Sequence, residues 1–315
     1  MDGCGCEGRD AQLFTGAPAC RMPACERFAG MVSSHTEDWM IDFHTHFGKL
    51  WRIGEKGRQN LDAEGLLSVM DEKGISLAVL LPLESPDWGG GYLLTEEVIE
   101  ARDRYPDRFI AFACADPRYP KAAEFIKRCV RDFHCAGFGE YVNGLALDDP
   151  LNLRLYEVCN DLGIPLVFEI ARPSLCYDEP GLPRLEKCLK RFPKIQWCGH
   201  GPHFWTAISA DDGEATGPYP KGRVKEGGAI DRLMSRYDNL WLDLSGMSGY
   251  NAMTRDPDFT AGFVQRHWRR MLLGTDITSK QNTLPILDWL AHLPVNATVR
   301  DALACGNARR LLRLA

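Results

Sequence analysis

Eight short apolar runs, separated by stretches of helical periodicity, constrain the fold of this 315-residue chain more than any other feature. The runs are MIDFHTH from Met40, SLAVLLPL from Ser76, RFIAFACADP from Arg108, AGFGEY from Ala136, IPLVFEI from Ile164, IQWCGHG from Ile195, LWLDLSG from Leu240 and MLLGTDIT from Met271. Apolar strands that alternate with amphipathic helices are typical of a parallel sheet. Eight such units make a barrel of ~250 residues. We therefore predict an α/β protein, a (β/α)8 TIM barrel over residues 39–315, after an irregular N-terminal extension over residues 1–38.

Two of the intervening stretches carry signals for both the body and the end of a helix. Apolar residues recur at i, i+3, i+4 and i+7 before a glycine in each: Ala63, Leu66, Leu67 and Met70 before Gly74, and Leu155, Val158, Cys159 and Leu162 before Gly163. A glycine at this position can take the left-handed conformation that caps a helix. Asp149 and Pro150 supply an N-cap and a first-turn proline for the second helix.

Charge and hydropathy argue against nucleic acid and membranes as partners. The formal net charge is -6, and no run of ~18 apolar residues could cross a bilayer. The first ten residues include four charged side chains and no apolar run, so we predict no secretory signal and a cytoplasmic location. The 12 cysteines are then expected to be reduced thiols that pack as small core residues. Those at positions 4, 6, 20 and 25 lack the paired CxxC spacing of a zinc site.

Histidines and carboxylates stand at the carboxyl ends of five of the predicted strands. They are His44 and His46 (strand 1), Glu140 (strand 4), Glu169 (strand 5), His200 (strand 6) and Asp276 (strand 8). The carboxyl ends of barrel strands open on one face, where barrel enzymes keep their active sites. Residues two apart in a strand point the same way, so His44 and His46 can reach one ion. Because burying these groups unpaired would cost several kcal/mol, we predict that all six bind one or two divalent cations, zinc first and manganese as the alternative.

The same residues resemble a known group of enzymes. IDFHTHF resembles the first-strand signature of the amidohydrolase superfamily. The order of HxH, strand 5, His200 and Asp276 within LLGTDIT resembles its second large family, which includes aminocarboxymuconate-semialdehyde and resorcylate decarboxylases. CGNARRLL, at residues 305–312, resembles that family's C-terminal motif. The resemblance runs from about residue 40 to the end and implies a metal-dependent barrel enzyme.

One position departs from the family pattern. Strand 5 reads PLVFEI, with Glu169 where the family normally has a metal-binding histidine. A carboxylate is a harder, anionic ligand that lowers the Lewis acidity of the ion and favours metals such as Mn²⁺. We expect Glu169 to remain a ligand. Two alternatives stay open: Glu169 and Glu140 could bridge two ions, or the metal site could be degraded.

The resemblance and the chemistry imply the same roles for the catalytic residues. A bound divalent ion lowers the pKa of water from about 15.7 toward ~7 and polarises a carbonyl. We expect Asp276 to be the base, while His200 ligates a second metal or hydrogen-bonds the developing oxyanion.

Residues near the predicted strand ends indicate the kind of substrate. Arg172 follows strand 5 and could clamp a carboxylate with its guanidinium. His203 and Trp205 after strand 6, and Trp51 after strand 1, predict further contacts with a small-molecule substrate, although aromatic side chains there can simply pack together. The long loop over residues 206–227 is either a lid or a subunit contact, which leaves a homo-oligomer open.

Three functions remain open at this point. A hydrolase of a small amide, ester or lactone is the first expectation. The alternative is a decarboxylase of a small carboxylated aromatic or unsaturated acid, which Arg172 and the aromatic neighbours favour. A barrel that binds without catalysing is the third.

Overall fold

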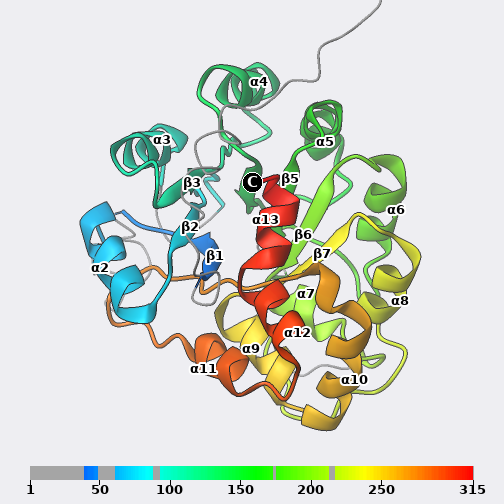
Figure 1. The fold of residues 1–315 in the computed structure, drawn as a ribbon. Helices are drawn as coiled ribbons and strands as arrows, with labels where there is room; N and C mark the ends of the chain where they lie inside the picture. Colours follow the sequence, from blue (N-terminus) through cyan, green and yellow to red (C-terminus); the bar gives the residue numbers. More distant parts are fainter. Residues whose placement is uncertain (1–38, 49–60, 88–92, 173–174, 213–216, 315) are drawn as a thin grey trace, which may run out of the picture.

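The computed structural model describes residues 39–48, 61–87, 93–172, 175–212 and 217–314. Within them, every predicted apolar run forms a strand (Figure 1). The strands are β1 (Ile41–Thr45), β2 (Leu77–Leu80), β3 (Phe109–Ala111), β4 (Phe138–Tyr141), β5 (Pro165–Glu169), β6 (Gln196–His200), β7 (Leu240–Asp243) and β8 (Met271–Leu272). Each pairs in parallel with the next along the chain from β1 to β3 and from β4 to β8.

Backbone contacts at two seams join these sheets into a closed barrel. Ala113 forms a parallel bridge with Phe138, which connects β3 to β4. At the other seam, the amide of Phe43 donates to the carbonyl of Leu273 at 2.8 Å, so β8 lies beside β1. Closure leaves neither sheet with a free edge at these positions, and it places all eight strand ends on one rim. The predicted fold class is confirmed.

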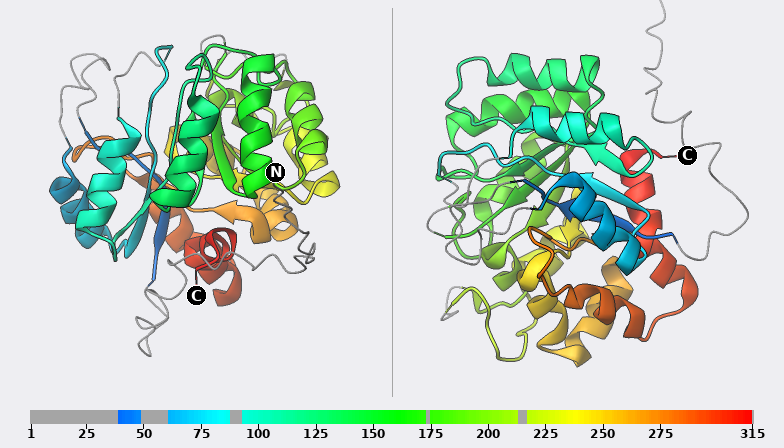
Figure 2. Two further views of the ribbon diagram at one scale, coloured as in Figure 1. Left: turned by 90° about the horizontal axis from the view of Figure 1, so that it is seen from above. Right: turned by 90° about the vertical axis from the view of Figure 1, so that its left-hand side faces the viewer.

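Helices surround the barrel, as the views along and across it show (Figures 1 and 2). They are α2 (Ala63–Lys73), α3 (Thr95–Arg104), α4 (Ala122–Asp132), α5 (Pro150–Leu162), α6 (Pro183–Arg191), α7 (Pro202–Thr206), α8 (Ala229–Arg236), α9 (Gly246–Thr254), α10 (Pro257–His267), α11 (Pro285–His292), α12 (Ala297–Asp301) and α13 (Asn307–Leu312). The two helices with complete sequence signals are confirmed. Gly74 and Gly163 end α2 and α5 in the left-handed conformation, and the side chain of Asp149 accepts a hydrogen bond from the amide of Leu151.

The end of the barrel opposite the strand ends is closed by α13. Ala308, Leu311 and Leu312 of this helix pack into the same cluster as the apolar side chains that fill the barrel. The side chain of Asn307 donates to the carbonyls of Trp268 and Met271, which fixes the start of α13 against β8. The asparagine of the C-terminal GNA sequence thus holds the helix that covers the barrel floor.

Two other expectations concern membranes and cysteines. No helix in the described part of the chain is long and apolar enough to span a bilayer. The cysteines among the described residues are free thiols, and all of them except Cys305 are buried, as expected for small core residues. The predicted N-terminal extension (residues 1–38) and Trp51 lie outside the described residues.

Candidate metal centre

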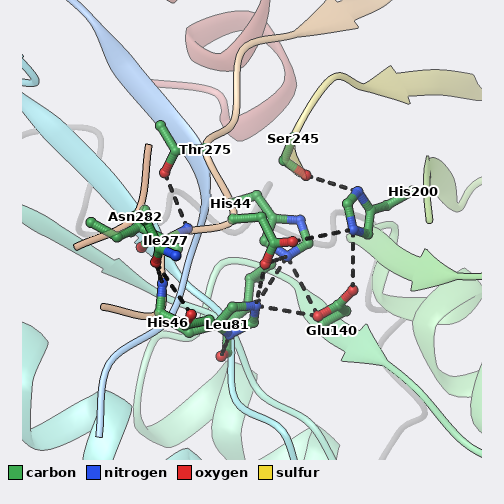
Figure 3. A network of polar contacts seen from close by, with 12 residues as sticks. His44, His46, Leu81, Glu140, His200, Ser245, Thr275, Ile277 and Asn282 are labelled. Carbon is green, nitrogen blue, oxygen red and sulfur yellow. Dashed lines mark hydrogen bonds and ion pairs between the residues drawn. The ribbon is translucent and has the colours of Figure 1, made fainter. Parts of the chain in front are cut away.

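Three imidazoles and two carboxylates converge at the carboxyl-end rim of the barrel. Figure 3 shows four of these residues: His44, His46, Glu140 and His200. His44 ends β1 with His46 just beyond it, and the Nε2 atoms of these two histidines lie 3.1 Å apart. Glu140 on β4 places Oε2 at 3.4 Å from His44 Nε2 and at 3.3 Å from His46 Nε2. His200, at the end of β6, and Asp276, beyond β8, complete the group. The same-facing HxH pair predicted from the strand period is confirmed.

The other ring nitrogen of each histidine is held by a partner outside the cluster. His44 Nδ1 lies 2.7 Å from Asp243 Oδ2, and His46 Nδ1 donates to the carbonyl of Leu81 at 2.8 Å. His200 Nδ1 lies 2.8 Å from Ser245 Oγ. Such partners fix the orientation of each ring and leave Nε2 as the ligand atom in the neutral imidazole.

Asp243 and Ser245 are functional residues that sequence reasoning missed. Asp243 is a buried acid at the end of β7, in the run LWLDLSG, where the strand-end criterion would have found it. Ser245 has no comparable signal because a serine after a strand is common. Both act through the histidines, so they are positioning residues.

Asp42 is a third missed residue, buried under the cluster. Its carboxylate accepts hydrogen bonds from the amide of His44 and from the amide and hydroxyl of Thr275. It therefore ties the two segments that carry His44 and Asp276. Burial raises the pKa of Asp42 to about 7, against the lowering effect of these hydrogen bonds.

The electrostatics of the cluster follow from burial and mutual proximity. Burial lowers the pKa of His44, but the carboxylates of Asp243 and Glu140 outweigh it and hold that pKa well above the usual value. Burial and the charge of His44 lower the pKa of His200. The pKa of Glu140 is held well below its ordinary value, because the facing histidines outweigh the effect of burial.

These residues fit a divalent cation. When both rings are neutral, the Nε2 lone pairs of His44 and His46 point at each other across 3.1 Å. A cation bound between these two atoms would remove this repulsion. Glu140 Oε1 is buried without a hydrogen-bond partner among the described residues. For ligand bonds of ~2.1 Å, neighbouring ligand atoms lie roughly 3.0–3.4 Å apart in octahedral or tetrahedral geometry. The spacings of 3.1, 3.3 and 3.4 Å between these side chains match that range.

Each carboxylate of the cluster has one oxygen near the His44 and His46 pair and the other near His200. Glu140 Oε2 faces the pair. Asp276 Oδ1 also faces it, at 3.8 Å from His44 Nε2 and 3.6 Å from His46 Nε2. Glu140 Oε1 and Asp276 Oδ2 each lie 3.9 Å from His200 Nε2. The arrangement has room for one ion near the histidine pair and for a second ion or a water beside His200.

Glu169 is brought to the rim but stands apart from this cluster. Its side chain lines the adjacent cavity, and no ion pair of 4.0 Å or less joins it to a histidine of the described chain. Burial, together with the charges of Glu140 and Asp276, raises the pKa of Glu169 well above its ordinary value. Its predicted role as a ligand therefore stays a prediction, and its side chain is also placed to meet a substrate.

Gly201 makes the space that Glu169 occupies. A Cβ at Gly201 would lie 2.4 Å from Glu169 Cγ and 2.9 Å from the carbonyl oxygen of Ile170, and Gly201 has a φ of +95°. We expect Gly201→Ala to destabilise the protein by about 1–3 kcal/mol, since both contacts and backbone conformation oppose a side chain. Urea unfolding measures this change. Gly217→Ala, at a glycine whose added Cβ meets nothing within 4 Å, is the control, and equal stabilities of the two variants would contradict the prediction.

The predicted substrate-binding residues after strands 5 and 6 lie beside the cluster but do not line the cavity. Arg172 pairs with Asp212 at 3.1 Å, and its backbone amide donates to His203 Nδ1. Trp205 is buried in the core, and its indole nitrogen donates to the carbonyl of Asp243. The structure thus gives these side chains protein partners, and their contact with a substrate stays a prediction.

A cavity of about 280 Å³ opens directly on the metal-binding cluster. His46, Glu140, Glu169, His200 and Asp276 are among its lining residues. The rest of the lining combines the apolar side chains of Leu83, Met247, Leu284, Pro285 and Ile286 with the polar side chains of Thr275, Thr278, Asn282 and Thr283. This volume is at the small end of the ~300–1,000 Å³ common for ligand sites, so the cavity suits a small molecule.

Part of the loop over residues 206–227 lies close to this cavity. The carbonyl of Pro220 accepts a hydrogen bond from Asn251 on α9, the helix that carries Met247. Burial, then the nearby charges of Glu169 and Asp276, raise the pKa of Tyr219. The described part of the loop is therefore near the cavity mouth, and its action as a lid or a subunit contact stays a prediction.

The raised pKa of His44 predicts that metal uptake releases protons. A raised pKa favours the protonated form of the metal-free imidazole, and a proton on Nε2 must leave before that atom can bind an ion. We expect proton release when the ion binds at pH 7, and an affinity that falls as the pH falls. Calorimetry of metal binding in two buffers of different ionisation enthalpy measures the released protons. Identical heats in both buffers would show that none is released.

Comparisons with known proteins give a family and a fold. A family model described as amidohydrolase matches residues 41–314. Among solved structures, an uncharacterized TIM-barrel protein from Bordetella bronchiseptica is 19% identical with a TM-score of 0.63, covering 87% of this chain and 98% of that one.

Two similar structures are of decarboxylases. The 2,6-dihydroxybenzoate decarboxylase from Rhizobium is 17% identical, with a TM-score of 0.57 and 88% and 99% of the two chains covered. The 5-carboxyvanillate decarboxylase from Novosphingobium aromaticivorans, solved as a mutant with manganese and 3-methoxy-4-hydroxy-5-nitrobenzoic acid, is 16% identical, with a TM-score of 0.61 and 90% and 99% covered. At these identities the structures establish the shared barrel fold. The comparison with curated proteins found no match.

Proposed function

The chain belongs to the amidohydrolase family, whose model spans residues 41–314, and from this membership we propose that it is a metal-dependent decarboxylase of a small carboxylated aromatic or unsaturated acid. This reverses the order expected from the sequence, in which a hydrolase came first. The similar solved structures are mostly of decarboxylases, including three that act on single-ring acids.

The cofactor in this proposal is a divalent ion held by His44, His46, Glu140 and Asp276. Zinc and manganese both accept such a mixed nitrogen and oxygen set, and two decarboxylases of similar structure contain manganese. A divalent ion there supplies the positive charge that binds a carboxylate and stabilises the negative charge that develops on the substrate.

The observation that carries the proposal is the composition of the cavity. No lysine or arginine is among the described residues that line it, so the metal-binding cluster is where a substrate carboxylate finds positive charge. Apolar lining side chains such as Leu83, Met247 and Ile286 then contact the body of the acid. In this proposal, the bond between the carboxylate and the rest of the molecule lies next to His200 and Asp276.

The residues of the cavity meet the proton requirement of the reaction. When the carbon–carbon bond breaks, CO₂ leaves, the electron pair stays on the remaining carbon, and one proton must reach that carbon. The side chain of Asp276 is 34% exposed and lines the cavity, so its carboxyl group can exchange protons with solvent and pass one to the substrate. His200, held by Ser245, hydrogen-bonds the substrate beside it.

Hydrolysis of an amide, ester or lactone is the second candidate. The observation that favours it is that His200 Nε2 and Asp276 Oδ2 lie 3.9 Å apart and face the same cavity. A carboxylate and an imidazole at this spacing can also orient a water for attack on a carbonyl.

Parallel assays on one preparation separate the two reactions. The full chain, loaded with zinc or with manganese, is incubated with a panel of hydroxylated and aminated single-ring acids and with a panel of esters, lactones and amides. We expect CO₂ release from at least one acid and none from chelator-treated protein. Hydrolysis of the second panel without CO₂ release from the first would overturn the proposal.

A further inference from the structure

We propose that Glu169 recognises a positively charged amine on the substrate, so that the natural ligand is a small acid that also carries an ammonium group. This inference rests on the proposed function for the binding of the acid at the cluster. It assigns Glu169 a role in specificity in place of the role in metal binding expected from the sequence.

The position of Glu169 separates it from the cluster. Glu140 and Asp276 each place a carboxylate oxygen within 4 Å of histidine ring nitrogens, whereas within the described ranges no such contact involves Glu169. No described residue donates a hydrogen bond to its carboxylate, although the side chain lines the cavity. Gly201 leaves room for the side chain at this position. The carboxylate is therefore held in the cavity with its hydrogen-bonding capacity free for a ligand.

No positively charged side chain among the described lining residues favours the charged form of Glu169. One divalent ion balances the two carboxylates that face the imidazoles, Glu140 and Asp276. Asp243 lies 2.7 Å from His44 Nδ1 and faces that ring instead of the cavity. No lysine or arginine is among the described lining residues, and Arg172, three residues further along, is paired with Asp212. A positive group on the ligand offsets the charge of Glu169, and it gains a charge-assisted hydrogen bond in a partly buried site.

The lining of the cavity offers contacts for the rest of such a ligand. Its carboxylate goes to the cluster and its ammonium to Glu169, while the carbon skeleton contacts apolar lining residues such as Met247 and Leu284. Because the lining puts Glu169 and the cluster in one small cavity, both polar groups must belong to a single compact molecule.

Matched ligands of equal shape test the charge directly. Calorimetry on metal-loaded protein compares the ortho, meta and para isomers of aminomethylbenzoate with the same isomers of hydroxymethylbenzoate. We expect at least one amine to bind about 10- to 100-fold more tightly than its alcohol, as a charged hydrogen bond gives. Glu169→Gln should abolish this preference. Glu100→Gln, an exposed change on α3, should keep it.

The outcomes separate this inference from the proposed function and from metal binding. Equal affinities for amine and alcohol in the unaltered protein would overturn the inference, even if CO₂ release is observed. An amine preference without CO₂ release from any acid would support the recognition role and count against the decarboxylase. Loss of a bound metal equivalent in Glu169→Gln, measured by elemental analysis, would show that Glu169 is a metal ligand and would also overturn the inference.

Discussion

Replacing Glu140 with glutamine is expected to remove most of the protein's affinity for divalent cations. Glutamine keeps the shape of the side chain but loses its negative charge, and Glu140 Oε2 lies within 3.4 Å of both His44 Nε2 and His46 Nε2. Removing one partner from a buried charged site costs about 3–5 kcal/mol. We therefore expect metal affinity to fall roughly 10²- to 10³-fold, since each 1.4 kcal/mol is a factor of ten.

Competition with a chelator of known affinity measures this loss for zinc and for manganese. Glu100→Gln is again the matched surface control, and it should bind metal as the unaltered protein does. Circular dichroism checks that the variant is folded, because Glu140 is buried. A folded Glu140→Gln protein with unchanged affinity would mean that the ion does not bind at this cluster.

The barrel was predictable from the sequence because its strands are defined locally. Each run is apolar over several residues, and two of the helices between the runs have their own stop signals, Gly74 and Gly163. The period of a strand also fixed the common direction of His44 and His46. The closing seams depend on contacts between residues far apart in sequence, such as Phe43 with Leu273, yet the count of eight strands already implied closure.

The parts of the site that escaped prediction depend on partners distant in sequence. From the sequence alone, the guanidinium of Arg172 was expected to be available for a substrate carboxylate. In the structure it pairs with Asp212, 40 positions away. Trp205 was expected to contact the substrate with its ring. In the structure its indole lies in the core and donates to the carbonyl of Asp243. No local pattern reveals such pairings. Asp42 was missed for another reason. An acidic residue inside a buried strand does not indicate by itself that the hydroxyl of Thr275 will donate a hydrogen bond to it.

Asp276→Asn is expected to produce the largest loss of turnover with little effect on the fold. Asp276 has a φ of +57°, a conformation that asparagine tolerates as well as aspartate does, so the backbone should be retained. The substitution removes the group that exchanges a proton with the substrate, and such groups contribute about 10²- to 10⁴-fold to rates. We therefore expect kcat to fall by that factor in whichever reaction the unaltered protein catalyses.

The amount of metal bound to Asp276→Asn shows which of two losses lowers its activity: the loss of the proton-transfer group or the loss of the ion. Asp276 Oδ1 lies 3.6 and 3.8 Å from the histidine nitrogens and is more exposed than Glu140, so its removal should weaken metal binding less than Glu140→Gln does. Turnover is measured at saturating metal, with elemental analysis of the same samples. Under these conditions Asp276→Asn should be metal-loaded and nearly inactive. A loaded variant that keeps more than about a tenth of the normal kcat would exclude Asp276 as the residue that moves the proton, since a role of that kind carries at least ~10²-fold.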